Sequence, residues 1–279
     1  MSTTTDLKEQ LQTIASNDFA IPEHIELFTL ALRMMDHIGS PDKQLRDDLI
    51  YTAFATWILE NHLFDSDQLH QLLMIALDDQ HIFYFIGETN TDSIFTRSFS
   101  VLLLPLILIA HRQKPFLPKS EITRIKERLL QYLFAEKDLR GYVEGKGWAH
   151  AVAHVGDVFD DLAQCLEVES ADLSEILEAI AAKICVDSIP YVHEEDERMT
   201  TAVVSILRRQ LLDETDVENW IRSFATRVQK TEPSPANHTH LNVKNFLRSL
   251  YFRMYQQDIE EKLTQAVAET LHEISYYKD

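Results

Sequence analysis

Apolar residues recur every three or four positions along most of the chain. Between positions 22 and 39, for example, Phe28, Leu32 and Met35 follow this spacing. Such a spacing gathers apolar side chains on one face of an α-helix. Glycine and proline, which interrupt helices, number only 6 and 8 among 279 residues. The pattern therefore predicts an all-α fold.

The predicted helices follow one another as hairpins. A weak helix is predicted over residues 6–16 and a clearer one within 22–39. The hairpins after them are 43–62 with 66–79, 92–112 with 119–136, 148–167 with 171–186, 196–212 with 215–230, and 241–256 with 258–276. Their first helices begin roughly 45 to 55 residues apart, near the period of HEAT and armadillo repeats. We expect one domain over residues 1–279, an α/α superhelix of five to six hairpins, with a closed (α/α)6 barrel as the alternative.

Two other apolar segments fit this all-helical picture. Residues 82–86, Ile-Phe-Tyr-Phe-Ile, resemble a strand, but no second segment is available to pair with it. We therefore expect a buried loop or helix end there, and no β-sheet. The most apolar run, residues 101–110, contains Pro105 and is much shorter than the roughly 20 residues that a membrane span needs. It predicts a buried helix.

The chain is strongly acidic. It has 45 Asp and Glu against 26 Lys and Arg, a formal net charge of −19. Repulsion between like charges argues against nucleic acid and against anionic membrane surfaces as partners. The only cysteines, Cys165 and Cys185, offer no disulfide framework, and the first ten residues show no secretory signal. We expect a cytoplasmic protein, and its oligomeric state is left open.

Two turns at the start of first helices resemble the interhelical turn of HEAT repeats. Asp42 is followed by Arg46, and Asp92 by Arg97. In those repeats the Asp and the Arg are structural, since they cap helices and tie neighbouring units together. The resemblance implies the same structural role for these four residues.

The least ordinary segment lies near the middle of the chain. Three of the six glycines, Gly141, Gly145 and Gly147, precede the sequence Trp-Ala-His-Ala-Val-Ala-His of residues 148–154. Glycine concentrated in one loop indicates tight turns or close backbone approach. On the helix predicted from residue 148, one narrow polar face gathers His150, His154, Asp157 and Asp161. Of these, the first three are our candidate catalytic residues, lining a groove of the repeat array.

His150 and His154 are also candidate metal ligands. Two imidazoles four residues apart on a helix can share a zinc ion, so zinc or another divalent metal is a candidate cofactor. Ala151 stands where the HExxH peptidase pattern needs its glutamate, which excludes that mechanism. Further ligands would have to come from Glu144, His193, His238 or His240. The alternative is that both histidines hydrogen-bond to Asp157 or to loop carbonyls.

The candidate binding residues are Arg97, Arg140, Glu144, Trp148 and Arg198. If the repeats stack in register, Arg97 and Arg198 flank the two histidines, and the pocket suits an anionic small ligand or acid–base chemistry. The alternative for both arginines is a salt bridge within the array. The three tryptophans, Trp57, Trp148 and Trp220, occupy apolar helix positions, which predicts that they lie in the core.

Several segments together resemble a known family. They are Gly147–Asp157 with its GWAHAVAH sequence, Ile38–Asp42 with Leu45–Asp47, Arg97–Ser100, Asp138–Gly141 and Phe246–Tyr251. On these, most of the chain resembles the bacterial domain-of-unknown-function family 2785. That family has no established activity, so the resemblance implies no mechanism.

Two functions fit the sequence. One is a small-ligand binder or metal-dependent enzyme with a localised polar site. The other is a scaffold without catalysis that binds a protein or peptide along a groove, for which the acidic charge favours a basic partner. The unusual residues concentrate between positions 138 and 157, which favours a localised site.

Overall fold

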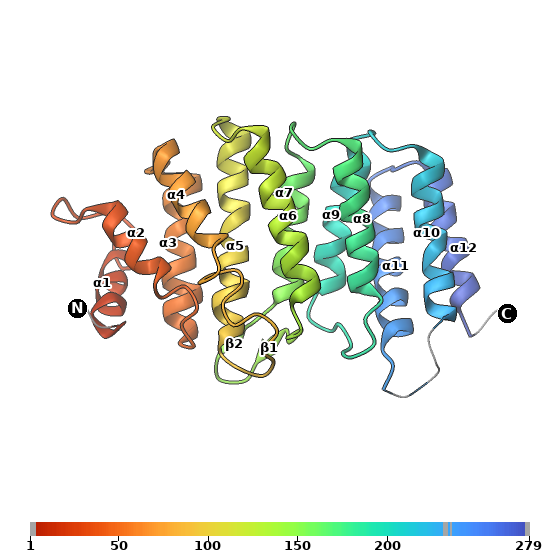
Figure 1. Ribbon diagram of the computed structural model, residues 1–279, viewed down its shortest axis with the longest axis horizontal. Helices are drawn as coiled ribbons and strands as arrows, with labels where there is room; N and C mark the ends of the chain where they lie inside the picture. The colour runs from red at the N-terminus through yellow and green to blue at the C-terminus, as the bar shows by residue number, and fades with distance from the viewer. Residues whose placement is uncertain (1–3, 231–233, 235, 277–279) are drawn as a thin grey trace. The chain divides into compact units, whose positions relative to one another are not determined.

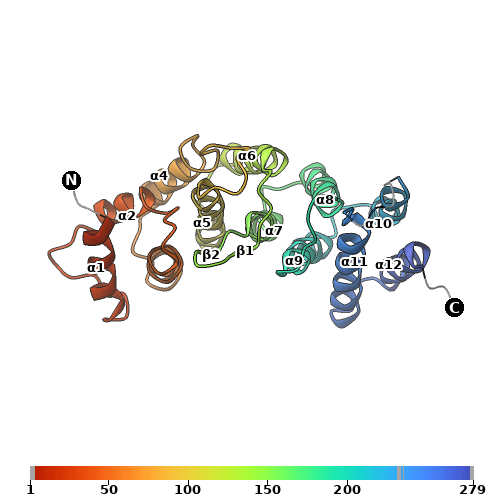
Figure 2. The ribbon, with the colours of Figure 1, turned by 90° about the horizontal axis from the view of Figure 1, so that it is seen from below.

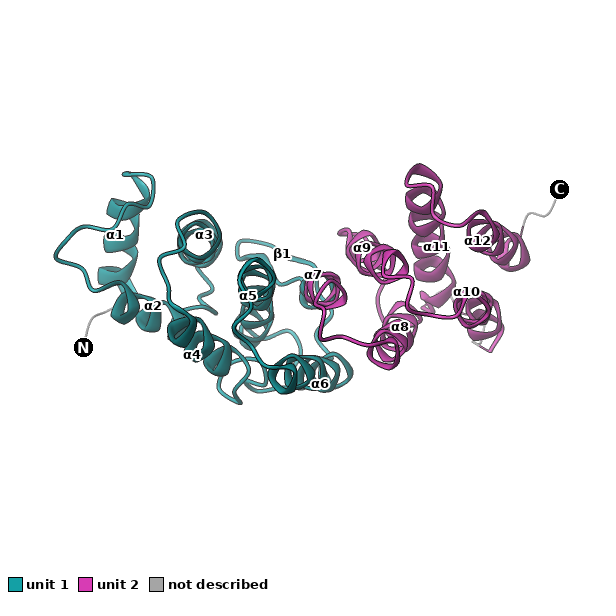
Figure 3. Cartoon of the chain, turned by 90° about the horizontal axis from the view of Figure 1, so that it is seen from above, with its two compact units in different colours: residues 1–154 teal, residues 155–279 magenta. Residues whose placement is uncertain are grey.

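The structure is a computed structural model, and it describes residues 4–230, 234 and 236–276 (Figure 1). The regular structure is almost entirely helical, which confirms the all-α prediction. The chain divides into two compact units, Met1–His154 and Val155–Asp279 (Figure 3). The boundary between them falls inside helix α7 (Ala151–Ala163).

Unit 1 holds the first helices and the unusual glycine-rich loop. Its helices are α1 (Thr4–Ala15), α2 (Leu27–Met35), η1 (Gln44–Tyr51), α3 (Thr52–Ala55), η2 (Thr56–Glu60), α4 (Ser66–Ala76), α5 (Ser93–Gln113) and α6 (Lys119–Ala135). The elements η1, α3 and η2 are continuous and make one helix over the predicted range 43–62, with π-helical winding at both ends. This helix packs against α1 on one side and α5 on the other.

Unit 2 shows stacked hairpins. After the end of α7, its helices are α8 (Ser170–Ile184), α9 (Glu195–Arg208), α10 (Glu214–Gln229), α11 (Thr239–Gln256) and α12 (Glu261–Ile274). Helix α9 packs against α11, and α10 packs against α12 (Figure 2). First helices thus contact first helices and second helices contact second helices, as in repeat proteins. The predicted helix ranges agree with the structure to within a few residues at most ends.

Helix α5 forms the centre of the unit 1 core. It is the one helix of the described residues that is long and apolar enough to cross a membrane, and 83% of its apolar window is buried inside the protein. Leu104, Pro105 and Ile107 are all buried. The prediction of a buried helix over 101–110 is confirmed.

The expectation of no β-sheet is wrong. Strands β1 (Tyr142–Val143) and β2 (Gly147–Trp148) form a short antiparallel hairpin, with Tyr142 opposite Trp148. Gly145 and Gly147 have φ values of +74° and +85°, which glycine adopts without strain and which allow the chain to reverse tightly. As a result, helix α7 begins at Ala151, three residues later than the predicted start at 148.

The segment 82–86 forms turns, as the missing strand partner indicated. Ile82 is fully buried, but Phe85 at the other end is 61% exposed. The expectation of a buried loop is therefore correct only for the start of this segment.

Candidate functional site

The β1–β2 hairpin is held in place by the buried side chain of Arg46. Its Nη2 donates a 2.7 Å hydrogen bond to the carbonyl of Lys146, and its Nη1 donates one of 2.7 Å to the carbonyl of Ser40. The guanidinium lies over two rings, 4.1 Å from the centre of Phe95 and 4.7 Å from that of Phe99. A planar cation therefore joins the hairpin to η1 and α5 through hydrogen bonds and cation–π contacts.

A carboxylate accompanies this buried cation. Asp47 lies 2.7 Å from Nε of Arg46. Burial lowers the pKa of Arg46, although the charge of Asp47 opposes that shift. Burial likewise raises the pKa of Asp47, and the charge of Arg46 opposes it. The pair thus offsets part of the cost of removing both groups from water.

Two further contacts fix the second half of the hairpin. A Cβ on Gly147 would lie 3.1 Å from both Nη2 of Arg46 and Cβ of Lys43, so a side chain here would make tight contacts with the start of η1. Lys146 Nζ lies 2.6 and 2.8 Å from the carboxylate oxygens of Asp92, at the start of α5. The structural role expected of Asp92 and Arg46 from the HEAT-like turns matches these contacts.

The hairpin presents an exposed aromatic pair. The rings of Tyr142 and Trp148 meet edge to face across the two strands, with centres 5.0 Å apart. Both side chains are 40% exposed. Trp57 and Trp220 lie in the core as predicted, but the same prediction is wrong for Trp148. The reason is that Trp148 belongs to β2 and not to a helix, so the helical pattern does not decide its burial.

His150 extends the stack inward. Its ring lies parallel to that of Trp148, 4.3 Å between centres and tilted by 22°. The residue has left-handed backbone geometry (φ 48°) just before α7, where its N–H donates to the carbonyl of Arg140 at 3.1 Å. Non-glycine residues adopt this geometry uncommonly, and here a second hydrogen bond, from the same N–H to the carbonyl of Gly141 at 3.3 Å, accompanies it. His150 is therefore held as part of the hairpin, and it is not on the helix that carries His154.

His154 links the stack to the core. It is buried, and its Nδ1 donates a 3.0 Å hydrogen bond to the carbonyl of Ser98. Its ring meets His150 and Phe99 edge to face, at 5.9 and 5.4 Å between centres. A continuous series of rings runs from the surface to the buried guanidinium: Tyr142, Trp148, His150, His154, Phe99 and Arg46.

The metal prediction gains no additional ligand from the structure. Within the described ranges, no group of three or more His, Cys, Asp or Glu is placed to hold a metal ion. Glu144 lies exposed at the tip of the hairpin. The other ligands considered, His193, His238 and His240, belong to unit 2, where Nε2 of His240 donates to the carbonyl of Ile274 at 2.8 Å.

Arg97 does not join the histidines in a pocket. It is fully buried, and its Nε and Nη2 donate to the two carboxylate oxygens of Glu136 at 2.6 and 3.0 Å. Its Nη1 donates to the carbonyl of Tyr84 at 2.9 Å. The salt-bridge alternative is therefore the one present for Arg97. The adjacent Ser98 is the residue whose carbonyl meets His154.

Arg140 has a similar structural position at the base of the hairpin. Its Nε and Nη2 donate to the two oxygens of buried Asp138 at 2.8 and 2.6 Å, and Nη2 also donates to the carbonyl of Thr91 at 2.8 Å. Asp138 in turn accepts from the N–H of Asn90. Sequence reasoning missed the buried carboxylates Glu136 and Asp138, although their alternation with Arg140 is a visible charge pattern.

Asp157 and Arg198 form a pair of their own within unit 2. The carboxylate of Asp157 on α7 lies 2.6 Å from Nη1 of Arg198 on α9. A Cβ on Gly156 would lie 2.9 Å from the backbone of Arg198, so glycine allows these two helices to approach closely. Burial raises the pKa of Asp157, and the charge of Arg198 opposes the shift. The salt bridge expected as the alternative for Arg198 is therefore present.

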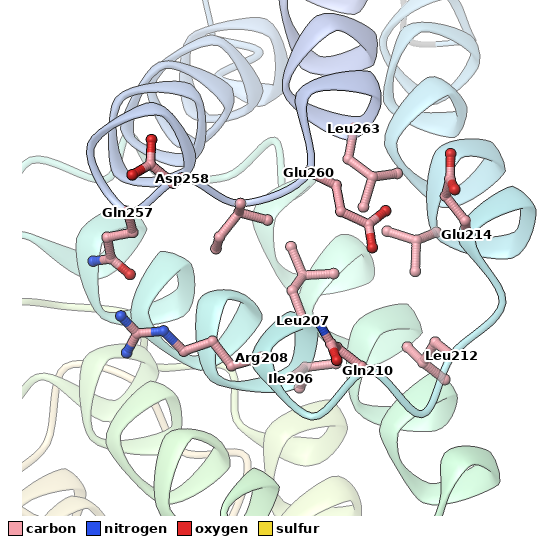
Figure 4. Close-up of a pocket in the computed structure, with 12 residues that line it drawn as sticks. Ile206, Leu207, Arg208, Gln210, Leu212, Glu214, Gln257, Asp258, Glu260 and Leu263 are labelled. Carbon is pink, nitrogen blue, oxygen red and sulfur yellow. The ribbon is translucent and has the colours of Figure 1, made fainter.

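Unit 2 also contains a cavity of about 310 Å³ between the α9–α10 and α11–α12 connections (Figure 4). Leu207 and Leu263 give it an apolar wall, and Glu214, Glu260 and Arg208 form polar parts of its lining. None of the site residues predicted from the sequence lines this cavity.

Comparison with known proteins identifies a family and little else. The model of the family described as "Protein of unknown function (DUF2785)" matches residues 82–252, which include the hairpin and the GWAHAVAH segment. No curated protein and no solved structure matches the chain. The family description names no ligand and no reaction.

Proposed function

The chain belongs to this family of proteins of unknown function, and from its geometry we propose that it is a binding protein whose β1–β2 hairpin holds a cationic side chain of a partner peptide. The observation that carries the proposal is the exposed Tyr142–Trp148 pair on an anchored hairpin. The face of an indole attracts ammonium and guanidinium groups more strongly than any other side-chain ring. The partner is therefore a segment rich in Arg or Lys.

The anchoring of the hairpin supports binding. Arg46, Lys146 and the stacked His150 hold Trp148 in one orientation before any ligand arrives. A preorganised ring loses little conformational entropy on binding, so more of the contact energy appears as affinity. Because Tyr142 and Trp148 are each only 40% exposed, a ligand can reach only part of each ring. This restricts how a partner side chain can bind.

The charge around the hairpin favours a cation. Glu144 is exposed at the hairpin tip, and the positive charge of Lys146 is neutralised by Asp92. The whole chain carries a formal charge of −19, which raises the local concentration of basic partners. Among cations, Arg is favoured over Lys because its planar guanidinium stacks on aromatic faces.

The same residues support catalysis less well. His154 is buried with Nδ1 bonded to a backbone carbonyl, and His150 is packed against Trp148. In this proposal both histidines support the aromatic surface and are not catalytic groups. Recognition needs only the contacts described within unit 1, whereas a metal-dependent reaction needs further ligands.

Fluorescence polarisation of labelled peptides tests the proposal. The probes are a peptide repeating Arg-Gly-Ser and matched peptides with Lys or Glu in place of Arg. We expect the Arg peptide to bind wild type best, and Trp148→Ala to weaken it by roughly five- to thirtyfold, the range that follows from a cation–π contact of about 1–2 kcal/mol. The matched control is Phe134→Ala, which removes another exposed ring of unit 1 on α6.

Two results would overturn the proposal. One is equal binding of the Arg and Glu peptides to wild type. The other is equal loss of affinity in Trp148→Ala and Phe134→Ala, which would mean that the hairpin has no special part in recognition.

A further inference from the structure

Helix α11 carries a net positive charge, whereas the chain as a whole is strongly acidic. Its 18 residues contain no Asp or Glu, although the chain holds 45 of them. The helix carries the basic residues Lys244, Arg248 and Arg253. Where such basic residues are exposed, they favour an acidic partner.

One face of α11 is exposed and partly apolar. The residues at positions 241, 248, 252 and 255 fall within about 60° of one another around the helix axis. We call them the α11 stripe: Leu241, Arg248, Phe252 and Tyr255. The three hydrophobic members are 43%, 58% and 68% exposed, in that order. The opposite face is buried against other helices of unit 2, chiefly α9 and α12.

The aromatic end of the stripe is ordered by neighbouring rings. Tyr251 and Tyr255 are stacked with centres 6.4 Å apart and nearly parallel, and Tyr251 meets Phe252 edge to face at 5.5 Å. Exposed aromatic side chains that are already packed against one another lose little freedom when a partner covers them. They are suited to act as the anchors of an interface.

Two of the three basic residues of α11 form no ion pair within the part of the chain that the structure describes. Arg253 is paired, with its Nε 3.4 Å from Glu197 and its Nη2 donating to Thr201 at 2.9 Å. Lys244 and Arg248, in contrast, form no ion pair with any residue that the structure describes. Two uncompensated cations beside apolar anchors complement an acidic, amphipathic partner.

We propose that the α11 stripe docks an amphipathic helix of another protein, with apolar residues along one face and acidic residues beside them. The spacing of seven, four and three residues along the stripe is the spacing by which one helix packs along another. The stripe spans about 21 Å at 1.5 Å per residue, enough for a partner helix of roughly four turns.

A second copy of this chain is a poor occupant. In an antiparallel pairing of two stripes about a two-fold axis, Leu241 faces Tyr255 of the other copy and Arg248 faces its own equivalent. A parallel two-fold pairing also brings the two Arg248 side chains together. Like charges at the centre of an interface oppose association, so the charge pattern selects a different, acidic chain.

This surface is independent of the proposed hairpin site. It lies in unit 2, whereas the hairpin lies in unit 1, and the two favour partners of opposite charge. Loss of one activity with retention of the other would therefore separate the two proposals.

Isothermal titration calorimetry on the full chain tests the docking surface. The probe is a synthetic amphipathic helix with leucines along one face and glutamates on its flanks, compared with the same peptide carrying lysines on its flanks. We expect wild type to prefer the glutamate peptide, and Arg248→Glu to lose at least about tenfold in affinity for it, as removal and reversal of an interfacial charge pair implies. Phe252→Ser should weaken both peptides.

The control variant is Arg208→Glu, which makes the same charge change at an exposed arginine of α9 outside the stripe and should leave both affinities unchanged. Absence of a preference for the glutamate peptide would overturn the proposal, and so would equal effects of the two Arg→Glu changes. Self-association that Phe252→Ser abolishes, without binding of the acidic peptide, would also overturn it and would assign the stripe to a second copy.

Discussion

Arg46 donates a 2.7 Å hydrogen bond to the carbonyl of Lys146, which lies 100 residues later in the chain. Through this contact a helix near the N-terminus holds the glycine-rich hairpin that carries Trp148. The proposed binding surface therefore depends on a residue that contacts no ligand itself.

Replacement of Arg46 by Lys tests this dependence. An ammonium group retains the charge but cannot bond Ser40 and Lys146 at once while stacking on Phe95. We expect the free energy of unfolding to fall by about 1.5–3 kcal/mol, as for a lost hydrogen bond of a charged group. Urea denaturation measures the change, and peptide affinity should fall with it. An unchanged midpoint and unchanged affinity would show that Arg46 does not support the hairpin.

Two glycine substitutions separate backbone strain from steric contact. Gly145→Ala meets open space and suffers only from its positive φ, so it should cost about 1 kcal/mol. Gly147→Ala also brings a methyl group to 3.1 Å from Arg46 and Lys43, so it should cost about 2 kcal/mol or more. Denaturation of both variants checks the order. Equal costs would contradict the close approach at Gly147.

The buried pair of Arg97 and Glu136 is expected to be structural. Arg97→Met leaves the carboxylate of Glu136 buried without its main partner and should destabilise the protein by about 3–5 kcal/mol. The double variant Arg97→Met/Glu136→Leu removes both charges and should recover a large part of that loss. If the single variant is instead as stable as wild type but loses peptide binding, Arg97 has the ligand role that the sequence analysis considered.

Asp157 gives a pH dependence of stability with a definite sign. Burial raises its pKa in the folded state above the value of about 3.9 that it has in an unfolded chain. Its contribution to stability is therefore full below that unfolded value and is lost as the pH rises through the raised folded pKa. Asp157→Asn cannot titrate, while all other carboxyl groups titrate in both proteins.

The measurement is the difference in Tm, wild type minus Asp157→Asn, between pH 7 and pH 4. We expect this difference to become more favourable to wild type on acidification. A difference that moves the other way would mean that the ion pair with Arg198 outweighs burial and lowers the pKa.

The helices were predictable because their signal is local. Apolar periodicity and polar connections place α4, α5 and α10 to within a few residues of the structure. The π-helical winding of η1 and η2 was not predictable, because apolar residues spaced three or four positions apart do not distinguish a short π-helix from an α-helix. The resemblance to the family is confirmed by the match over residues 82–252.

The sequence singled out the segment that carries the hairpin, but it did not predict the form of that segment. The glycine cluster and the two histidines pointed to residues 138–157, and the unusual hairpin lies there. Strands of two residues are too short for an alternating pattern, so the hairpin was not visible in the sequence. The surroundings of Arg97 depend on how α5 packs against segments distant in the sequence, and its side chain pairs with Glu136, 39 residues later.

The most direct test of the proposed function is the exposure of Trp148 to acrylamide, with and without the Arg-Gly-Ser peptide. Trp57 and Trp220 are buried and donate to backbone carbonyls, so collisional quenching reports chiefly on Trp148. Our account predicts that saturating peptide lowers the quenching of wild type towards that of Trp148→Phe. Peptide that binds wild type and leaves the quenching unchanged would contradict it.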